Sequence, residues 1–253
     1  MTSPGTLTID KNNRVTTVTF GHPSGNSFPA DLLQKLTDAF DELSNDVDTS
    51  VIVLKSEGDG PFCAGASFDE LLAVSNLEEG TRFFSGFANV INAMRRCSKI
   101  ILGRVQGKTV GGGVGLAAAC DHVLATEHAQ VKLSEIAIGI GPFVIAPAVE
   151  RKIGLSGLSE LTLCPTDWKS AYWAKDKGLY ENVYKNTDVL DDALESFAKN
   201  LATYNPEALA QMKKAFWHDT DHWATLLYER AAISGQLVLS DFTKNALSQF
   251  KKK

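Results

Sequence analysis

Cysteine is scarce in this sequence, with four residues among 253. They are Cys63, Cys97, Cys120 and Cys164, and no two of them form a C-x-x-C pair. A small secreted scaffold held together by disulfides has many more cysteines for its length. The scarcity therefore excludes that class and indicates a protein of a reducing compartment.

Long apolar runs and excess positive charge are missing as well. No stretch approaches the roughly 20 residues of a membrane-spanning helix, and Met1–Asp10 lacks the basic-then-apolar pattern of a secretory leader. The 25 Lys and Arg against 30 Asp and Glu give a net charge of −5, and the one basic run, Lys251–Lys253, is expected to be solvated. Nucleic-acid surfaces need clustered Lys and Arg. We expect a cytoplasmic protein that binds neither nucleic acid nor a membrane.

What the sequence has is the composition of a globular protein with a sizeable core, 44% hydrophobic and 22% charged. Short strand-like runs alternate with amphipathic helix patterns, which is typical of an α/β domain. The expected strands are Thr6–Asp10, Val15–Phe20, Val51–Leu54, Ile100–Val105 and His122–Thr126. The expected helices are Pro29–Leu43, the segment from Phe83 to Met94, and a short stretch from about Gly113.

Strand patterns fade beyond about Leu155, and helix patterns take over. We therefore expect an α/β core over residues 1–195 and a helical region over residues 196–253. The expected helices here run from Asp167, as the capping residue, to Lys177, onward from the capping pair Asn205-Pro206, and from Asp221 to Phe250.

The segment "QGKTVGGGVGLAAACD", residues 106–121, follows an expected strand and carries four clustered glycines, Gly111 to Gly113 and Gly115, where a helix is expected to begin. Gly113 to Ala118 fits the dinucleotide fingerprint G-x-G-x-x-A, and Glu135 lies twenty residues after Gly115. That fingerprint normally opens the first βαβ unit of its domain, whereas about a hundred residues precede it here. A P-loop is also disfavoured, because no Gly-Lys-Ser or Gly-Lys-Thr follows the glycines.

A second loop of small residues, "PFCAGAS" at residues 61–67, also joins a strand to the start of a helix. Two such loops can each turn one backbone N–H toward a common point. Paired donors of this kind form an oxyanion hole, which stabilises negative charge that develops on a carbonyl oxygen.

The two loops, the early "HPSGNSF" and the continuation "ACDHVLATEHAQVKLSE" resemble, in order and spacing, the crotonase superfamily of enoyl-CoA hydratases and isomerases. The resemblance implies a spiral ββα core, a helical C-terminal trimerisation region, and a homotrimer or homohexamer. It implies an acyl-CoA thioester as substrate, coenzyme A being part of that substrate, and no metal, nicotinamide or flavin cofactor.

The resemblance also assigns site residues by matching positions. The N–H groups of Ala66 and Gly112 correspond to the oxyanion-hole donors, and Glu135 corresponds to a catalytic glutamate. Substrate-contacting positions correspond to Asn26, Cys63, Ala64, Ser67 and Gly111. Lys244 or the terminal lysines are candidates for the phosphates of coenzyme A.

One position departs from the family pattern. Hydratases of the family usually carry two glutamates, and Gly115 stands where the first is expected. Hydration divides two tasks between two carboxylates, whereas moving a double bond from C3 to C2 needs one base. Glu135 alone therefore favours a Δ3-Δ2-enoyl-CoA isomerase over a one-glutamate hydratase, and a catalytically silent acyl-CoA-binding protein is a further alternative. The length of the acyl chain does not follow from the sequence, because the walls of the acyl pocket come from loops with no assigned structure, such as Ala73–Thr81.

Two histidines have a spacing that occurs in metal sites. His218 and His222 stand four residues apart on an expected helix, a spacing that can present both to one ion. No Glu-x-x-His motif or nearby cysteine completes a set, so we predict two solvated side chains and no metal site.

Overall fold

The structure is a computed structural model that describes residues 5–250. Its centre is a six-stranded sheet in the order β1-β2-β3-β4-β6-β8, in which only the β1–β2 pair is antiparallel. The strands are β1 (Thr6–Asn12), β2 (Val15–Gly21), β3 (Val51–Ser56), β4 (Ile100–Val105), β6 (His122–Thr126) and β8 (Asn182–Tyr184). The predicted α/β class is confirmed.

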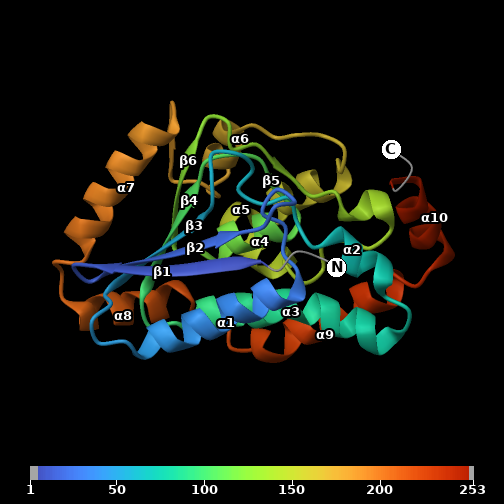
Figure 1. Ribbon diagram of the computed structural model, residues 1–253, viewed down its shortest axis with the longest axis horizontal. Coiled ribbons are helices and arrows are strands. Elements are labelled where there is room, and N and C mark those ends of the chain that lie inside the picture. The colour runs from blue at the N-terminus through green and yellow to red at the C-terminus, as the bar shows by residue number, and fades with distance from the viewer. Residues whose placement is uncertain (1–4, 251–253) are drawn as a thin grey trace.

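Helices cover both faces of this sheet (Figure 1). Along β3, Ile52 and Leu54 join the main core, whereas Val51 and Val53 belong to a smaller core. Successive side chains of a strand point to opposite faces, so a continuous apolar run marks a strand buried on both. The helices of the main core are α1 (Ala30–Asn45), α3 (Leu77–Arg96), α4 (Gly112–Ala119), α5 (Ala146–Leu163) and α9 (Trp223–Leu237), and α7 (Thr187–Leu201) covers the smaller core.

Most predicted elements of the first 130 residues are present within two or three residues of their expected ends. The β1–β2 turn lies at Asn13 and Arg14, both at positive φ, as a tight hairpin requires. The remaining elements are α2 (Phe68–Ala73), the two-residue strands β5 (Thr109–Val110) and β7 (Val131–Lys132), the 3₁₀ helix η1 (Glu135–Ile138), α6 (Ala171–Asp176), α8 (Pro206–Phe216) and α10 (Asp241–Phe250).

The second half of the chain corrects two predictions and adds a strand that the sequence did not indicate. The helix expected from Asp167 begins at Ala171 instead, because Ser170 accepts the N–H of Trp173 and caps it. The helix expected over Asp221–Phe250 is broken into α9 and α10. Strand β8 was not expected at all, since three residues carry no readable period.

The expected boundary at residue 195 falls inside α7, and α9 packs along α3 of the core. The division into two regions therefore stays a prediction. At the start of α8, Asn205 accepts the N–H groups of Glu207 and Ala208, which confirms the expected capping pair with Pro206. None of the helices within residues 5–250 is both long and apolar enough to cross a bilayer.

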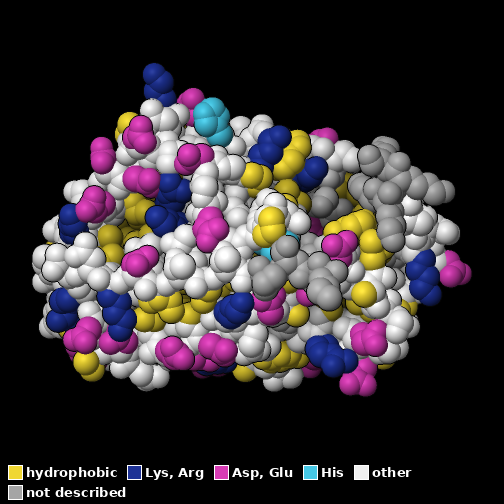
Figure 2. Space-filling view, in the orientation of Figure 1, with side chains coloured by type: hydrophobic (Ala, Val, Ile, Leu, Met, Phe, Trp, Pro, Cys, Tyr) yellow, Lys and Arg dark blue, Asp and Glu magenta, His cyan; other side chains and the backbone are white. Residues whose placement is uncertain are grey.

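Charged side chains of both signs are interspersed over the molecular face in Figure 2. One ion pair is buried: Nζ of Lys213 lies 2.9 Å from Oδ2 of Asp121, and both side chains are 2% exposed. Asp121 also accepts the indole N–H of Trp217 and the backbone N–H of Ile101. This network attaches α8 to the start of β4 and β6.

Removing one partner of a buried ion pair leaves the other charge without compensation. We expect Lys213→Ala to lower the free energy of unfolding by about 3–5 kcal/mol, measured by urea denaturation. The matched control is Lys214→Ala, because Lys214 is the exposed neighbour on the same helix and its loss is expected to cost less than about 0.5 kcal/mol. Equal losses in the two variants would contradict this account.

Candidate active site

Backbone hydrogen bonds outside the six-stranded sheet bring the two small-residue loops together. The N–H of Cys63 donates to the carbonyl of Lys108 over 3.3 Å, and the N–H of Val110 donates to the carbonyl of Cys63 over 2.9 Å. The loop of residues 61–67 therefore lies directly beside β5, at the point where the glycine loop begins.

The same ladder continues from β5 to β7. The N–H of Thr109 donates to Gln130, and the N–H of Gly111 donates to Lys132 over 3.0 Å. Glu135 follows β7 after two further residues, so the pairing places it beside Gly111. Two short strands thus connect three segments that are far apart in the sequence.

The N–H groups of Ala66 and Gly112 at this junction are left without a hydrogen bond among residues 5–250. The neighbours of Ala66 are used, since Ser67 donates to Phe28 and Gly65 donates to the sulfur of Cys63, but the N–H of Ala66 is not. The N–H of Gly112, the first residue of α4, donates to no described group either. Ala66 and Gly112 line one pocket, the arrangement that a pair of oxyanion donors requires.

Glycine is required at both positions of the turn into α4. Gly111 has a φ of 55°, and a methyl carbon added there would lie 2.8 Å from Oε1 of Glu135. One added at Gly112 would lie 2.1 Å from Cε1 of Phe87. The absent side chains leave room for the Glu135 carboxyl group on one side and for an aromatic ring on the other.

Glu135 begins η1, and its Oε2 is buried without a hydrogen-bond partner among residues 5–250. Burial raises the pKa of this carboxyl group from 4.5 to about 7, against the smaller opposing effect of hydrogen bonds from the backbone of Glu135 and Ser134. The residue as a whole is only partly buried, whereas Oε2 of its carboxyl group is fully buried. The turn after η1 packs on α10, where Gly139 contacts Phe242 and Thr243.

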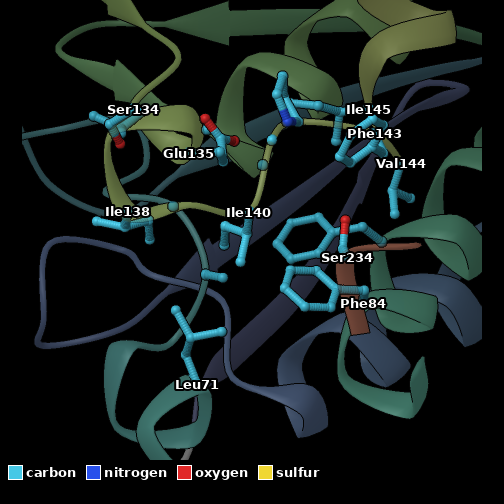
Figure 3. A pocket seen from close by; sticks show the side chains of 18 of the residues that line it. Leu71, Phe84, Ser134, Glu135, Ile138, Ile140, Phe143, Val144, Ile145 and Ser234 are labelled. Atoms are coloured by element: carbon cyan, nitrogen blue, oxygen red, sulfur yellow. The ribbon is translucent and has the colours of Figure 1, made fainter. Parts of the chain in front are cut away.

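The pocket is a small apolar cavity of about 150 Å³ (Figure 3). Glu135 is the one ionisable side chain among the described residues that line it, and the other polar side chains are Ser134 and Ser234. The apolar side chains are those of Phe68, Leu71, Phe83, Phe84, Phe87, Val110, Ile138, Ile140, Pro142, Phe143, Val144 and Ile145.

Gly115 does not line the pocket itself but lies against Ile145, which does. A methyl carbon at Gly115 would lie 2.4 Å from Cγ2 of Ile145, a residue just before α5. A carboxylate attached at Gly115 would therefore meet a hydrocarbon side chain where the family pattern has its first glutamate.

The predicted substrate-contacting residues fall into two groups. Ala64 and Gly111 line the pocket, whereas Asn26, Cys63 and Ser67 do not. Asn26 donates to the carbonyls of Glu57 and Pro61, and Ser67 caps α2. Burial raises the pKa of the Cys63 thiol to about 12, which fits a packing role rather than a nucleophile. These three side chains hold the loop in place, and their contact with substrate stays a prediction.

Several pocket residues were not expected from the sequence. Phe84 and Phe87 belong to the predicted helical segment from Phe83 to Met94, and no sequence motif marks Ile145 or Ser234. His218 and His222 lie in the turn between α8 and α9 rather than on a helix, so helical ligand spacing does not apply. No cluster of metal-ligating side chains occurs in the described part of the chain.

Two curated relatives match much of the chain. A protein of Clostridium acetobutylicum named short-chain-enoyl-CoA hydratase is 25% identical over 249 residues, 97% of this chain and 94% of that protein. The peroxisomal delta(3,5)-delta(2,4)-dienoyl-CoA isomerase of Arabidopsis thaliana is 26% identical over 203 residues, 74% and 71% of the two chains.

A solved structure shows the same fold. The enoyl-CoA hydratase from Bacillus halodurans aligns with a TM-score of 0.89 over 96% of this chain and 99% of that chain, at 20% sequence identity. The sequence model of the enoyl-CoA hydratase/isomerase family matches residues 10–253. The predicted crotonase-like fold is confirmed, and this chain belongs to the enoyl-CoA hydratase/isomerase family.

Proposed function

We propose that the protein is a Δ3-Δ2-enoyl-CoA isomerase that uses one glutamate. Glu135 removes a proton from C2, the double bond moves from C3–C4 to C2–C3, and the protonated Glu135 returns the proton at C4. The observation that carries the proposal is the pocket wall, whose described residues include one ionisable side chain and place Ile145 against Gly115. Coenzyme A belongs to the substrate, and no further cofactor takes part.

The environment of Glu135 suits a group that must both take and give a proton. A pKa of about 7 leaves comparable amounts of the acid and the base near neutral pH, which favours transfer in either direction. The thioester oxygen becomes negative when C2 loses its proton. The free N–H groups of Ala66 and Gly112 stabilise that charge, and an oxyanion donor contributes on the order of 3–4 kcal/mol to the transition state.

A one-glutamate hydratase is the second candidate, because the Clostridium acetobutylicum relative that matches 97% of the chain is named a hydratase. Hydration needs a water molecule that is held and activated beside C3. The side chain of Ile145, which lies against Gly115, has no polar group that could hold a water molecule. We therefore favour the isomerase over the hydratase.

The two reactions change the conjugated thioester absorbance in opposite directions. We expect the absorbance to rise when the protein is incubated with a 3-enoyl-CoA, because a conjugated 2-enoyl-CoA forms. A fall with a 2-enoyl-CoA as substrate would instead establish the hydratase. Binding of both thioesters without turnover would favour a silent acyl-CoA-binding protein and contradict both enzymes.

The base is tested by Glu135→Gln. We expect this variant to lose at least about 100-fold in kcat while still binding acyl-CoA, because the amide cannot accept the C2 proton. In the unmodified protein kcat/KM should rise with pH through about 7, as Glu135 ionises. The control is Glu127→Gln at an exposed site outside the pocket. A loss of only a few-fold, or a flat pH profile, would remove Glu135 from the role of base.

The same carboxyl group makes stability depend on pH. Its pKa is raised on folding, so its contribution is fully present below about 4.5 and is lost as pH rises through about 7. The shift corresponds to about 3 kcal/mol. We expect Glu135→Gln to be more stable than the unmodified protein at pH 8 by up to this amount, with the difference vanishing in acid. Denaturation at several pH values measures it, and a pH-independent difference would contradict burial as the cause.

A further inference from the structure

Ser234 is a polar residue on an apolar wall of the pocket. It lies on α9, is 1% exposed, and is shown in Figure 3 on the side that carries Phe84, Phe143 and Val144, away from Glu135. Its hydroxyl group makes no hydrogen bond with any residue between 5 and 250, although it faces the cavity. Its oxygen is not one of the fully buried unpartnered oxygens of the described residues, so the hydroxyl opens into the cavity, where a bound group can reach it.

The helix itself could have satisfied this hydroxyl. Serine within a helix commonly donates to the carbonyl four residues earlier, and Ser85 on α3 does so, with its Oγ 2.7 Å from the carbonyl oxygen of Thr81. Ser234 makes no such bond. Its hydroxyl group is therefore directed into the cavity and is not used in a hydrogen bond to the backbone of its own helix.

Close helix packing fixes Ser234 at this place. At the crossing of α3 and α9, a methyl carbon added to Gly235 would lie 2.6 Å from the backbone nitrogen of Thr81, and one added to Gly80 would lie 2.7 Å from the carbonyl oxygen of Gly235. The two backbones are in contact, so α9 cannot withdraw without losing this packing. The residue next to Gly235 is held against the pocket.

We propose that Ser234 recognises an uncharged hydrogen-bonding group, a hydroxyl or a keto group, carried by the acyl chain beyond the reacting carbons. This inference rests on the proposed function and names its substrate class. A charged group does not fit, because the described lining holds no Lys, Arg or His, and a carboxylate there would be buried without a counter-charge. The cavity of about 150 Å³ has room for a short acyl group.

Binding measurements test this separately from catalysis. Saturated acyl-CoA thioesters of increasing length, which have no double bond to move, are each compared by calorimetry with the analogues bearing a terminal hydroxyl or keto group. At one short length the unmodified protein should bind a polar analogue up to about tenfold more tightly than the plain thioester, as expected for one neutral hydrogen bond. Ser234→Ala should abolish or reverse that preference.

Ser85→Ala is the matched control, because Ser85 lies on the partner helix outside the pocket lining and its hydroxyl is bonded. It should keep the preference and lose a little thermal stability, whereas Ser234→Ala should keep or gain stability. Equal binding of plain and polar thioesters at every length, or a preference that survives Ser234→Ala, would overturn the inference. A preference in a protein without isomerase activity would support Ser234 and reject the proposed reaction; isomerisation without a preference would do the reverse.

Discussion

The ladder of backbone hydrogen bonds from Cys63 through β5 to β7 is the constraint on which the site depends. It contains few bonds, yet it joins a loop that follows β3, a loop that follows β4, and the segment after β6. The large sheet sets these segments at one end of the molecule, and the ladder sets their register. Asn26 fixes the loop of residues 61–67 through hydrogen bonds to the carbonyls of Glu57 and Pro61, and Ser67 caps α2 after it. The N–H of Ala66 takes no part in the ladder.

Several unpartnered polar groups face the same cavity. Elsewhere the buried charges are compensated, as Lys213 and Asp121 are, at the junction of α8 with the sheet. At the cavity the carboxyl oxygen of Glu135, two N–H groups and the hydroxyl of Ser234 have no partner within the described residues. A polar group without a hydrogen-bond partner is unfavourable for folding. In this cavity a bound ligand would supply the missing partners.

The sequence predicted the strands and helices whose apolar residues recur at a regular spacing. Buried strands such as β4 and β6 and amphipathic helices such as α1 were readable, because side-chain alternation and the helical repeat leave a pattern. Strands β5 and β7 are two residues long and carry none, although they determine the site. The cap at Ser170 was missed because Asp167 is an equally good capping residue and only tertiary contacts choose between them. The glycine loops indicated Ala66, Gly112 and Glu135 through their resemblance to a family, whereas Ile145 and Ser234 come from segments without a motif.

Gly111 and Gly112 have a consequence for how such a protein diversifies. In the proposed reaction, the thioester oxygen is held by two amides of the main chain, and Glu135 alone contributes a side chain to the chemistry. A main-chain amide persists through every substitution except proline, so alanine substitutions in the aromatic and aliphatic lining would leave both amides in place, whereas Gly111 and Gly112 have no room for a methyl group. The aromatic and aliphatic walls can then vary among relatives while the thioester is still held in the same place. The preference for an acyl group can therefore change in evolution without a change in the reaction.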